Sequence, residues 1–154
     1  MDSSIEVETR EAALCLIQRG ELFLVAEIRD PLTGTVLHRP PGGGVESGET
    51  PEHAVRREVR EELNIDLGTI RALGAVDHVW FWKGREVRER AWLFLADQSV
   101  GPRLEQGESP DLVEPDGDRF KTLWRSMHDS PADLPKLCPL IAREVLELTR
   151  FDVG

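Results

Sequence analysis

The chain has 154 residues and is 40% hydrophobic, which suits a single folded domain spanning residues 1–154. Its formal net charge of −10 disfavours duplex nucleic acid as a partner, because duplex phosphates are bound by clustered Lys and Arg. The longest apolar runs fall far short of the roughly 20 residues that cross a bilayer, and the charged N-terminus lacks a signal-peptide core, so we expect a cytoplasmic protein with no membrane partner.

Two short apolar runs near the N-terminus predict a pair of strands. Residues 12–18 and 21–28 are rich in aliphatic side chains, and Arg19-Gly20 between them is typical of a tight hairpin turn. Residues 30–34 contain Asp, Pro, Thr and Gly, which are strong turn signals. We therefore expect residues 35–38 to pair as a brief return strand.

A pair of prolines and three glycines follow this return strand. Pro40-Pro41 cannot donate to a sheet ladder, and the glycines of residues 42–44 let the chain approach a ligand or a neighbouring element closely. We expect an irregular loop at the glycines. His38 and Arg39 precede it, and each is either a residue that flanks a bound phosphate or an ordinary surface residue of the strand.

The next segment carries helix signals at both ends. Thr50 suits the N-cap, and Pro51 suits the first helical position because its missing N–H would be unpaired there. Glu52 adds an early negative charge that the helix dipole favours. Asn64 tolerates the left-handed conformation that closes helices, so we predict a helix from Pro51 that stops at Asn64.

Three acidic residues of this helix lie on one side of it. At about 100° per residue, Glu58, Glu61 and Glu62 fall within an arc of about 100°. An apolar stripe borders them and consists of Val55, Val59 and Leu63. Like charges at this spacing oppose helix formation, and partial burial raises the cost, so a hard divalent cation is the natural compensation. Arg57 is spaced to pair with Glu61.

The whole stretch from Gly43 to Ile65, GGVESGETPEHAVRREVREELNI, resembles the Nudix box. The glycine, Glu49, the Arg57-Glu58-Val59 triplet and the Glu61-Glu62 pair agree with it in order and spacing. Asn64 replaces the family's penultimate glycine, which is a mild change because both residues terminate helices in the left-handed conformation.

This resemblance implies a hydrolase that cleaves a nucleoside diphosphate linked to another moiety with Mg²⁺ or Mn²⁺. It assigns metal binding to Glu58, Glu62, Glu61 and the carbonyl of Gly42. Glu61 is also the candidate to help deprotonate water, and Arg57 supports catalysis by pairing with Glu49. The substrate's phosphates would lie near Arg39, Gly43 and Gly44.

Residues 70–82 and 86–96 predict a long hairpin about Lys83-Gly84 that presents large aromatic side chains on one face. Trp80 and Trp82 are candidates for stacking on a nucleobase, although an aromatic ladder is also typical of sheet core. His78 is either a general base or a structural residue.

Positions about sixteen residues past the box bear on substrate choice. ADP-ribose-cleaving relatives tend to have a proline where this chain has Phe81, and dinucleoside-polyphosphate-cleaving relatives often have a tyrosine where it has Trp82. Signatures associated with cleavage of NADH or coenzyme A are not visible. Nucleoside di- or triphosphates and dinucleoside polyphosphates are therefore the expected substrates.

The segment from Asp97 to Asp118 is acidic and rich in Gly and Pro, which predicts a long loop. In the Nudix family a glutamate from this region often joins the metal shell or acts as the base. The candidates are Glu105, Glu108 and Glu114, with Glu114 preferred because it lies nearest the next strand. A solvated acidic loop without a ligand is the alternative.

The C-terminal part is predicted to contain a strand over residues 122–127, a short helical turn at 128–131 and a helix over 139–150. This order matches the Nudix arrangement. The expected fold is α/β (α+β): an α/β/α sandwich with a mixed central sheet on which the box helix and a C-terminal helix pack.

Two other functions stay open. A Nudix-like domain can sense a nucleotide or ADP-ribose without turnover, and an isopentenyl-diphosphate isomerase shares the fold but needs an additional Cys and Glu in its pocket. Cys15 and Cys138 give the second alternative little support, since Cys15 lies in an apolar strand and is expected in the core. An exposed aromatic hairpin also suits a homodimer.

Overall fold

The computed structural model describes residues 5–97, 110–126, 135–139, 141 and 143–149. Its strands are β1 (Glu6–Arg19), β2 (Leu22–Arg29), β3 (Val36–Arg39), β4 (Gly42–Gly44), β5 (Ile70–Trp82), β6 (Arg85–Asp97), β7 (Leu112–Val113), β8 (Arg119–Ser126) and β9 (Lys136–Leu137). Its helices are α1 (Pro51–Leu63) and α2 (Arg143–Glu147). The sheet order is β5-β6-β1-β2-β3-β9, while β4 pairs with β1, β8 with β2 and β7 with β8. The predicted mixed sheet with the helix at 51–63 packed on it is confirmed.

Strand β1 is the centre of the core because its second half is buried on both faces, as a continuous apolar run predicts. Ala13, Cys15 and Ile17 belong to the hydrophobic cluster that includes the apolar face of α1. Leu14 and Leu16 belong to a second cluster on the opposite face, which includes residues of β5, β6 and α2. The expected burial of Cys15 in the core is confirmed.

Strand β1 begins at Glu6, six residues earlier than the sequence predicted. Its added first half pairs in parallel with β6, in a register that runs from Glu6↔Arg85 to Gln18↔Asp97. This half lacks the apolar run that marks the second half, and its pairing partner is far away in the sequence. Local pattern therefore gave no strand signal there.

The other edge of β1 is shared between two strands. The register of β2 with β1 covers only Gln18↔Phe23 and Arg19↔Leu22, and β4 pairs with β1 farther back along the strand. The predicted irregular loop at the glycines is thus wrong, since they form a short strand. A Cβ on Gly42 would lie 2.1 Å from the carbonyl oxygen of Ala13, so only glycine fits there.

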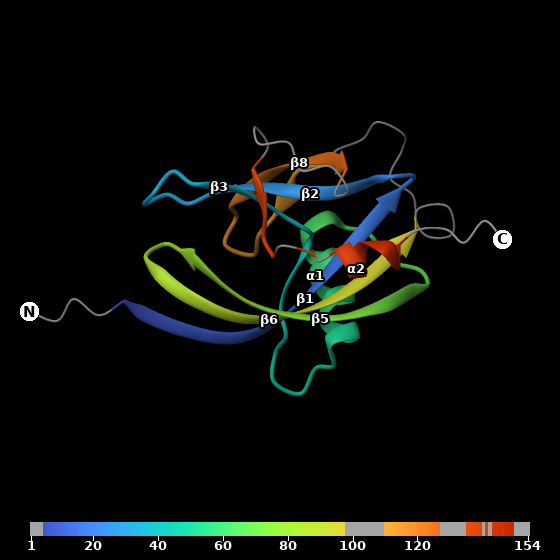
Figure 1. Cartoon of the computed structure of the whole chain (residues 1–154), viewed down its shortest axis with the longest axis horizontal. Helices are drawn as coiled ribbons and strands as arrows, with labels where there is room; N and C mark the ends of the chain where they lie inside the picture. Colours follow the sequence, from blue (N-terminus) through green and yellow to red (C-terminus); the bar gives the residue numbers. More distant parts are fainter. Residues whose placement is uncertain (1–4, 98–109, 127–134, 140, 142, 150–154) are drawn as a thin grey trace, which may run out of the picture.

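The early departure of β2 from β1 splits the sheet into two halves. Figure 1 shows β5, β6 and the first half of β1 as one curved layer, with β2, β3 and β8 above it. His38 and Arg39 lie in β3 and are 1% and 8% exposed, so the interpretation of either as a surface strand residue is wrong. Strand β3 is paired on both sides, to β2 and to β9, so it is an interior strand of the sheet and not an edge strand.

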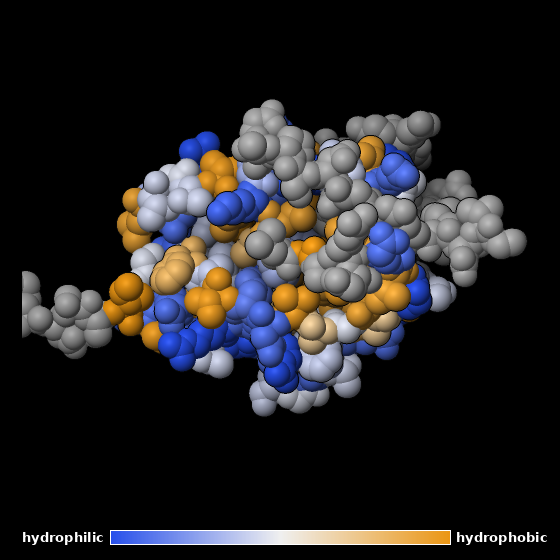
Figure 2. Space-filling model, viewed as in Figure 1, coloured by the Kyte–Doolittle hydropathy of each residue, from blue (hydrophilic) through white to orange (hydrophobic). Residues whose placement is uncertain are grey.

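The C-terminal helix is shorter than predicted, since α2 covers only Arg143–Glu147. The chain is not helical at Cys138, whose N–H donates to the carbonyl of His38 at 2.9 Å next to the pairing of β9 with β3. The predicted turn at 128–131 and residues 140, 142 and 150 lie outside the described residues. No helix among the described residues is long and apolar enough to span a membrane. Figure 2 shows hydrophobic residues on this face in patches separated by hydrophilic ones.

Candidate active site

Helix α1 is fixed at both ends as the sequence predicted. The hydroxyl of Thr50 accepts a hydrogen bond from the backbone N–H of His53 at 3.1 Å. Asn64 has φ of 56° and donates its backbone N–H to the carbonyl of Arg60. Val55 and Val59 are fully buried, and they set which side of α1 faces β1 and β4.

Two carboxylates of α1 lie directly against the glycine strand β4. Glu62 is 3% exposed, and its Oε1 accepts a hydrogen bond from the backbone N–H of Gly42 at 3.1 Å. A Cβ on Gly43 would lie 2.7 Å from the carboxylate carbon of Glu58. The glycines therefore make room for acidic side chains as well as for β1.

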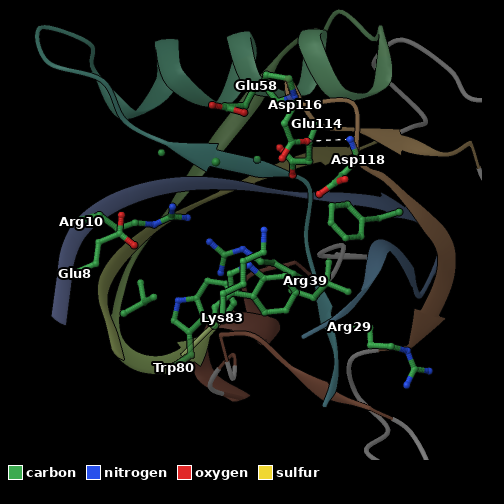
Figure 3. Close-up of a pocket in the computed structure, with 18 of the residues that line it drawn as sticks. Glu8, Arg10, Arg29, Arg39, Glu58, Trp80, Lys83, Glu114, Asp116 and Asp118 are labelled. Atoms are coloured by element: carbon green, nitrogen blue, oxygen red, sulfur yellow. Dashed lines mark hydrogen bonds between the residues drawn. The ribbon is translucent and has the colours of Figure 1, made fainter. Parts of the chain in front are cut away.

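A third carboxylate reaches the same place from the turn between β7 and β8. Glu114 donates its backbone N–H to the carbonyl of Asp118 at 2.8 Å, which closes the turn. Figure 3 shows the Glu114 side chain beside that of Glu58, below α1. The sequence predicted Glu114 as the preferred loop candidate, while Glu105 and Glu108 lie outside the described residues.

Burial is the largest cause that raises the pKa of each of these three carboxylates. Burial, then the charges of Glu114 and Glu58, raise the pKa of Glu62 to about 9. Burial and the charge of Glu58 raise the pKa of Glu114. Burial also raises the pKa of Glu58, although Arg57 opposes this. Carboxylate oxygens held together at such a cost are a donor set that suits a hard divalent cation.

The carboxylates do not already form a closed ligand shell. Within the described parts of the chain, no three or more His, Cys, Asp or Glu side chains are grouped as metal ligands. Glu62 is turned toward the N–H of Gly42, and Oε1 of Glu58 accepts from Arg57 at 3.0 Å. The fit to a cation thus rests on the chemistry of the donors and on their shared buried position.

Arg57 holds Glu58 in position through a set of hydrogen bonds to neighbouring residues. Its Nε and Nη2 donate to the two oxygens of Glu49 at 2.7 and 2.8 Å, and Nη2 also donates to the carbonyl of Gly44 at 3.1 Å. The hydrogen bond from Arg57 lowers the pKa of Glu49 to about 2. A bidentate pair of this kind fixes a guanidinium in both position and orientation, and it holds Nη1 beside Glu58.

Glu61 is the most exposed of the three acids of α1 that were predicted as metal ligands. Its side chain is 45% exposed, and its contact is with Nη1 of Arg57 at 3.4 Å. Consecutive helical residues differ by about 100° in direction, and here Glu62 takes the buried direction. The arc that included all three acids was too wide to tell which of them face the site.

A cavity of about 590 Å³ lies between the two halves of the sheet. Its acidic lining residues are Glu8, Glu58, Glu114, Asp116 and Asp118, and its cationic ones are Arg10, Arg29, Arg39 and Lys83. Figure 3 shows Arg10, Arg39 and Lys83 on the opposite side of the cavity from Glu58, Glu114 and Asp116. The predicted substrate residues Arg39, Gly43, Gly44, Trp80 and Trp82 all line it.

The aromatic wall of the cavity is already partly covered. The guanidinium carbon of Arg39 lies 4.7 Å from the centroid of the Trp80 ring, and Trp82 lies next to Trp80 with centroids 5.8 Å apart. A nucleobase would therefore meet Trp82 and the Arg39–Trp80 pair. Phe81 is 56% exposed and does not line the cavity, as expected from strand alternation.

Several residues of the cavity were missed by the sequence analysis. Arg10 lines its cationic wall, and the buried Glu89 beside the wall accepts hydrogen bonds from Arg10 and Arg39 at 2.7 and 2.9 Å. His78, a candidate general base, also contacts Glu89, at 2.8 Å. Alternation along β6 places Glu89 and Val87 on the inner face, but only the pairing with β1 shows that Arg10 lies beside them.

The chain is similar to known proteins in sequence and in fold. A family model described as NUDIX domain matches residues 8–147. The chain is 33% identical over 143 residues to the NAD-capped RNA hydrolase NudC of Haemophilus influenzae (strain PittGG), and 29% identical over 118 residues to that of Pseudomonas entomophila (strain L48). These matches cover 86% and 77% of this chain but 45% and 37% of the relatives, so the chain spans less than half their length. The crystal structure of a MutT NUDIX hydrolase from Burkholderia pseudomallei superimposes with a TM-score of 0.63 at 31% identity, covering 93% of this chain and 99% of that one.

Proposed function

This chain belongs to the NUDIX domain family, and we propose that it hydrolyses the pyrophosphate linkage of a nucleoside diphosphate derivative by attack of water on phosphorus. One observation carries the proposal. Glu58 and Glu114 line the acidic end of the cavity, Glu62 is buried against Gly42 of the same lining, and burial raises the pKa of all three. A site for a small anionic substrate would not be acidic unless a cation bridged the two.

The residues present fit Mg²⁺ or Mn²⁺, which would be held by Glu58, Glu62 and Glu114. Such an ion lowers the pKa of bound water and neutralises charge on the phosphates. Helix α1 and β4 keep Glu58 and Glu62 close to the glycines, and Arg57 keeps Glu58 oriented. Of the candidates for accepting the proton of the attacking water, Glu114 lines the cavity and Glu61 does not. General-base assistance is typically worth about 10²–10⁴ in rate.

The cavity suits a nucleotide in size and lining. Its volume of about 590 Å³ lies within the range of roughly 300–1,000 Å³ for small-molecule sites. Trp82 offers a stacking surface, and the cationic wall offers donors to phosphate oxygens. Nucleoside di- and triphosphates and dinucleoside polyphosphates are the proposed substrates. The printed function of the NudC relatives adds NAD-type dinucleotides to the compounds that need testing.

The experiment measures release of orthophosphate and pyrophosphate, and separates nucleotide products by chromatography because NAD⁺, NADH and dinucleoside polyphosphates are cleaved into two nucleotides. Purified protein is incubated with nucleoside di- and triphosphates, dinucleoside polyphosphates, NAD⁺ and NADH in Mg²⁺ or Mn²⁺. We expect turnover of at least one compound, with kcat lowered roughly a hundredfold or more in Glu58→Gln and Glu62→Gln. Glu52→Gln, which changes an exposed glutamate in the first turn of the same helix, is the matched control.

The opposite result would identify a sensor. If no phosphoanhydride is cleaved while a nucleotide still binds tightly, the hydrolase proposal fails. The isomerase alternative receives no support from the structure, because Cys15 is fully buried in the core and Cys138 is not among the described residues that line the cavity.

A further inference from the structure

We propose that Arg10 binds a phosphate group of the substrate at the cationic wall of the cavity, and that Glu89 is the positioning residue that holds Arg10 and Arg39 there. This inference rests on the proposed function for the identity of the substrate. The contacts that define the anion site lie outside the Nudix box.

Glu89 is a buried carboxylate with three partners from three other strands. Its side chain is 0% exposed. Its Oε2 accepts from Nε of Arg10 on β1 at 2.7 Å and from Nη2 of Arg39 on β3 at 2.9 Å, and its Oε1 lies 2.8 Å from Nε2 of His78 on β5. Burial alone raises the pKa of Glu89, but the hydrogen bond of His78 and the charges of Arg39 and Arg10 outweigh it and hold that pKa below its usual range.

Three contacts hold the guanidinium of Arg39 in place. Nη2 is bound to Glu89, Nη1 donates to the carbonyl of Cys138 at 3.4 Å, and the face of the guanidinium lies over the Trp80 ring. Arg39 is buried and so contributes its charge more than its donors. It is a fixed part of the wall.

Arg10 differs from Arg39 because most of its guanidinium stays available. Only its Nε is bound to Glu89, and no group in the described ranges accepts a hydrogen bond from its two Nη groups. Its side chain is 32% exposed and lines the cavity. Figure 3 shows the labelled Arg10 at the side of the cavity, across from Glu58 and Glu114.

The charges of Arg10, Arg39 and Glu89 together favour the binding of an anion. The guanidinium groups of Arg10 and Arg39 share the single carboxylate of Glu89, in a chain whose net charge is −10. Glu8 lines the same wall, but no ion pair joins it to Arg10 in the described structure. A guanidinium with two free N–H groups matches the spacing of two phosphate oxygens. A phosphate group held at Arg10 would direct the other phosphates of the substrate toward the carboxylates on the opposite side of the cavity.

The test compares Arg10→Gln with Arg10→Lys and with Arg90→Gln. Arg90 is a matched control because it belongs to β6, is exposed and pairs with Asp77 outside the cavity. With inorganic pyrophosphate as the calorimetric probe, in EDTA and again in Mg²⁺, we expect Arg10→Gln to weaken binding roughly ten- to a hundredfold. Arg10→Lys should restore part of the affinity, and Arg90→Gln should match the wild type.

Kinetic measurements then distinguish a positioning role of Glu89 from a general loss of structure. With whichever nucleotide is hydrolysed, Arg10→Gln should raise KM about tenfold or more, leave kcat within about threefold and weaken the dependence of KM on NaCl. Glu89→Gln should raise KM in the same way, and the double variant should be little worse than Arg10→Gln, because both act on one contact. A purely structural Glu89 would instead give additive effects and lower kcat.

The outcomes distinguish this inference from the proposed function. If nucleotides are hydrolysed but Arg10→Gln behaves like Arg90→Gln in binding and in KM, the inference is overturned and the hydrolase stands. If nothing is hydrolysed but pyrophosphate binding depends on Arg10, the hydrolase proposal fails and the anion site stands. If Glu89→Gln does not fold, as judged by circular dichroism, the Arg10 variants alone decide.

Discussion

Gly43 shows how a missing side chain can serve an acidic site. Each of the three glycines of β4 meets different surroundings. A Cβ on Gly42 would strike the backbone of β1, a Cβ on Gly43 would strike the Glu58 carboxylate, and a Cβ on Gly44 would meet nothing within 4 Å. Gly42 also has φ of 138°, a conformation that L-residues rarely adopt. Gly42 therefore supports the fold, whereas Gly43 supports the position of one carboxylate.

This difference predicts that Gly43→Ala separates activity from stability. The new methyl group would displace the end of the flexible Glu58 side chain, which is cheap for the fold but moves a proposed metal ligand. We expect activity to fall about 10–100-fold, while the melting temperature stays close to that of the wild type. Kinetics and differential scanning calorimetry of the same samples measure both.

Gly44→Ala is the control for this prediction, because it adds the same methyl group to the same strand in open space. It should retain nearly full activity. Equal losses in Gly43→Ala and Gly44→Ala would show that β4 tolerates no side chain at all, and would remove the special role of Gly43.

At the residue scale, the sequence revealed what lies close together along one helix. The resemblance to the Nudix box implied the ion pair of Glu49 and Arg57 and singled out Glu58 and Glu62. The partners of Glu89 were not foreseeable. In the string REVRER it looks like part of a solvated charged strand, and its burial depends on Arg10 and Arg39 arriving from distant strands.

At the element scale, β3 is held by a buried histidine. Nδ1 of His38 lies 2.9 Å from Nη1 of Arg125 on β8, and Nε2 lies 3.2 Å from the carboxylate of Glu27 on β2. Since Arg125 can only donate, Nδ1 accepts and Nε2 carries the proton. The neutral ring therefore links three strands, while an imidazolium would turn an N–H toward the guanidinium.

This arrangement predicts an acid-sensitive fold. Burial lowers the pKa of His38, with Arg125 adding to the effect and Glu27 opposing it. A histidine whose folded-state pKa lies below the unfolded value of 6.5 binds fewer protons in the folded state, so stability is present above pH 6.5 and is lost as the pH falls below it. The melting temperature of the wild type should fall between pH 7.5 and pH 5.5 more than that of His38→Gln.

His53→Gln is the control for this measurement, because His53 lies exposed on α1 with its side chain 69% exposed. It should follow the wild type across the whole pH range. A fall of the same size in His38→Gln would assign the acid sensitivity to other groups and would contradict the argument.

Elements with local signals were predicted better than those made by pairing. Both ends of α1 followed from a cap, a proline and an asparagine. The glycine strand β4, the first half of β1 and the short β9 exist because a distant strand offers free backbone groups. The local sequence of a strand does not show whether such a distant pairing partner is available.

At the scale of the whole molecule, the split sheet separates acidic from cationic groups. Helix α1 and the turn at 114–118 bring carboxylates to one side of the cavity, and β1, β3 and the β5–β6 hairpin bring cations and tryptophans to the other. The order of elements was predictable, and with it the mixed α/β fold. The cavity was not, because it depends on where β2 departs from β1 and on the parallel pairing of β1 with β6.

This separation predicts that divalent cations stabilise the whole fold. Buried carboxylates that repel one another cost free energy until a cation joins them, and a ligand that binds only the folded state stabilises it by mass action. At a hundredfold excess over its dissociation constant the gain is about 2.7 kcal/mol, which for a domain of this size raises the melting temperature by roughly 5–10 °C. Scanning calorimetry with Mg²⁺, and after its removal by EDTA, measures the shift.

NaCl at matched ionic strength should raise the melting temperature only slightly, because screening weakens repulsion between surface charges rather than within a buried cluster. Glu58→Gln should lose most of the shift and Glu52→Gln should keep it, since only Glu58 lies against β4. An equal shift in NaCl, or an undiminished one in Glu58→Gln, would place the cation elsewhere and would detach the carboxylate cluster from metal binding.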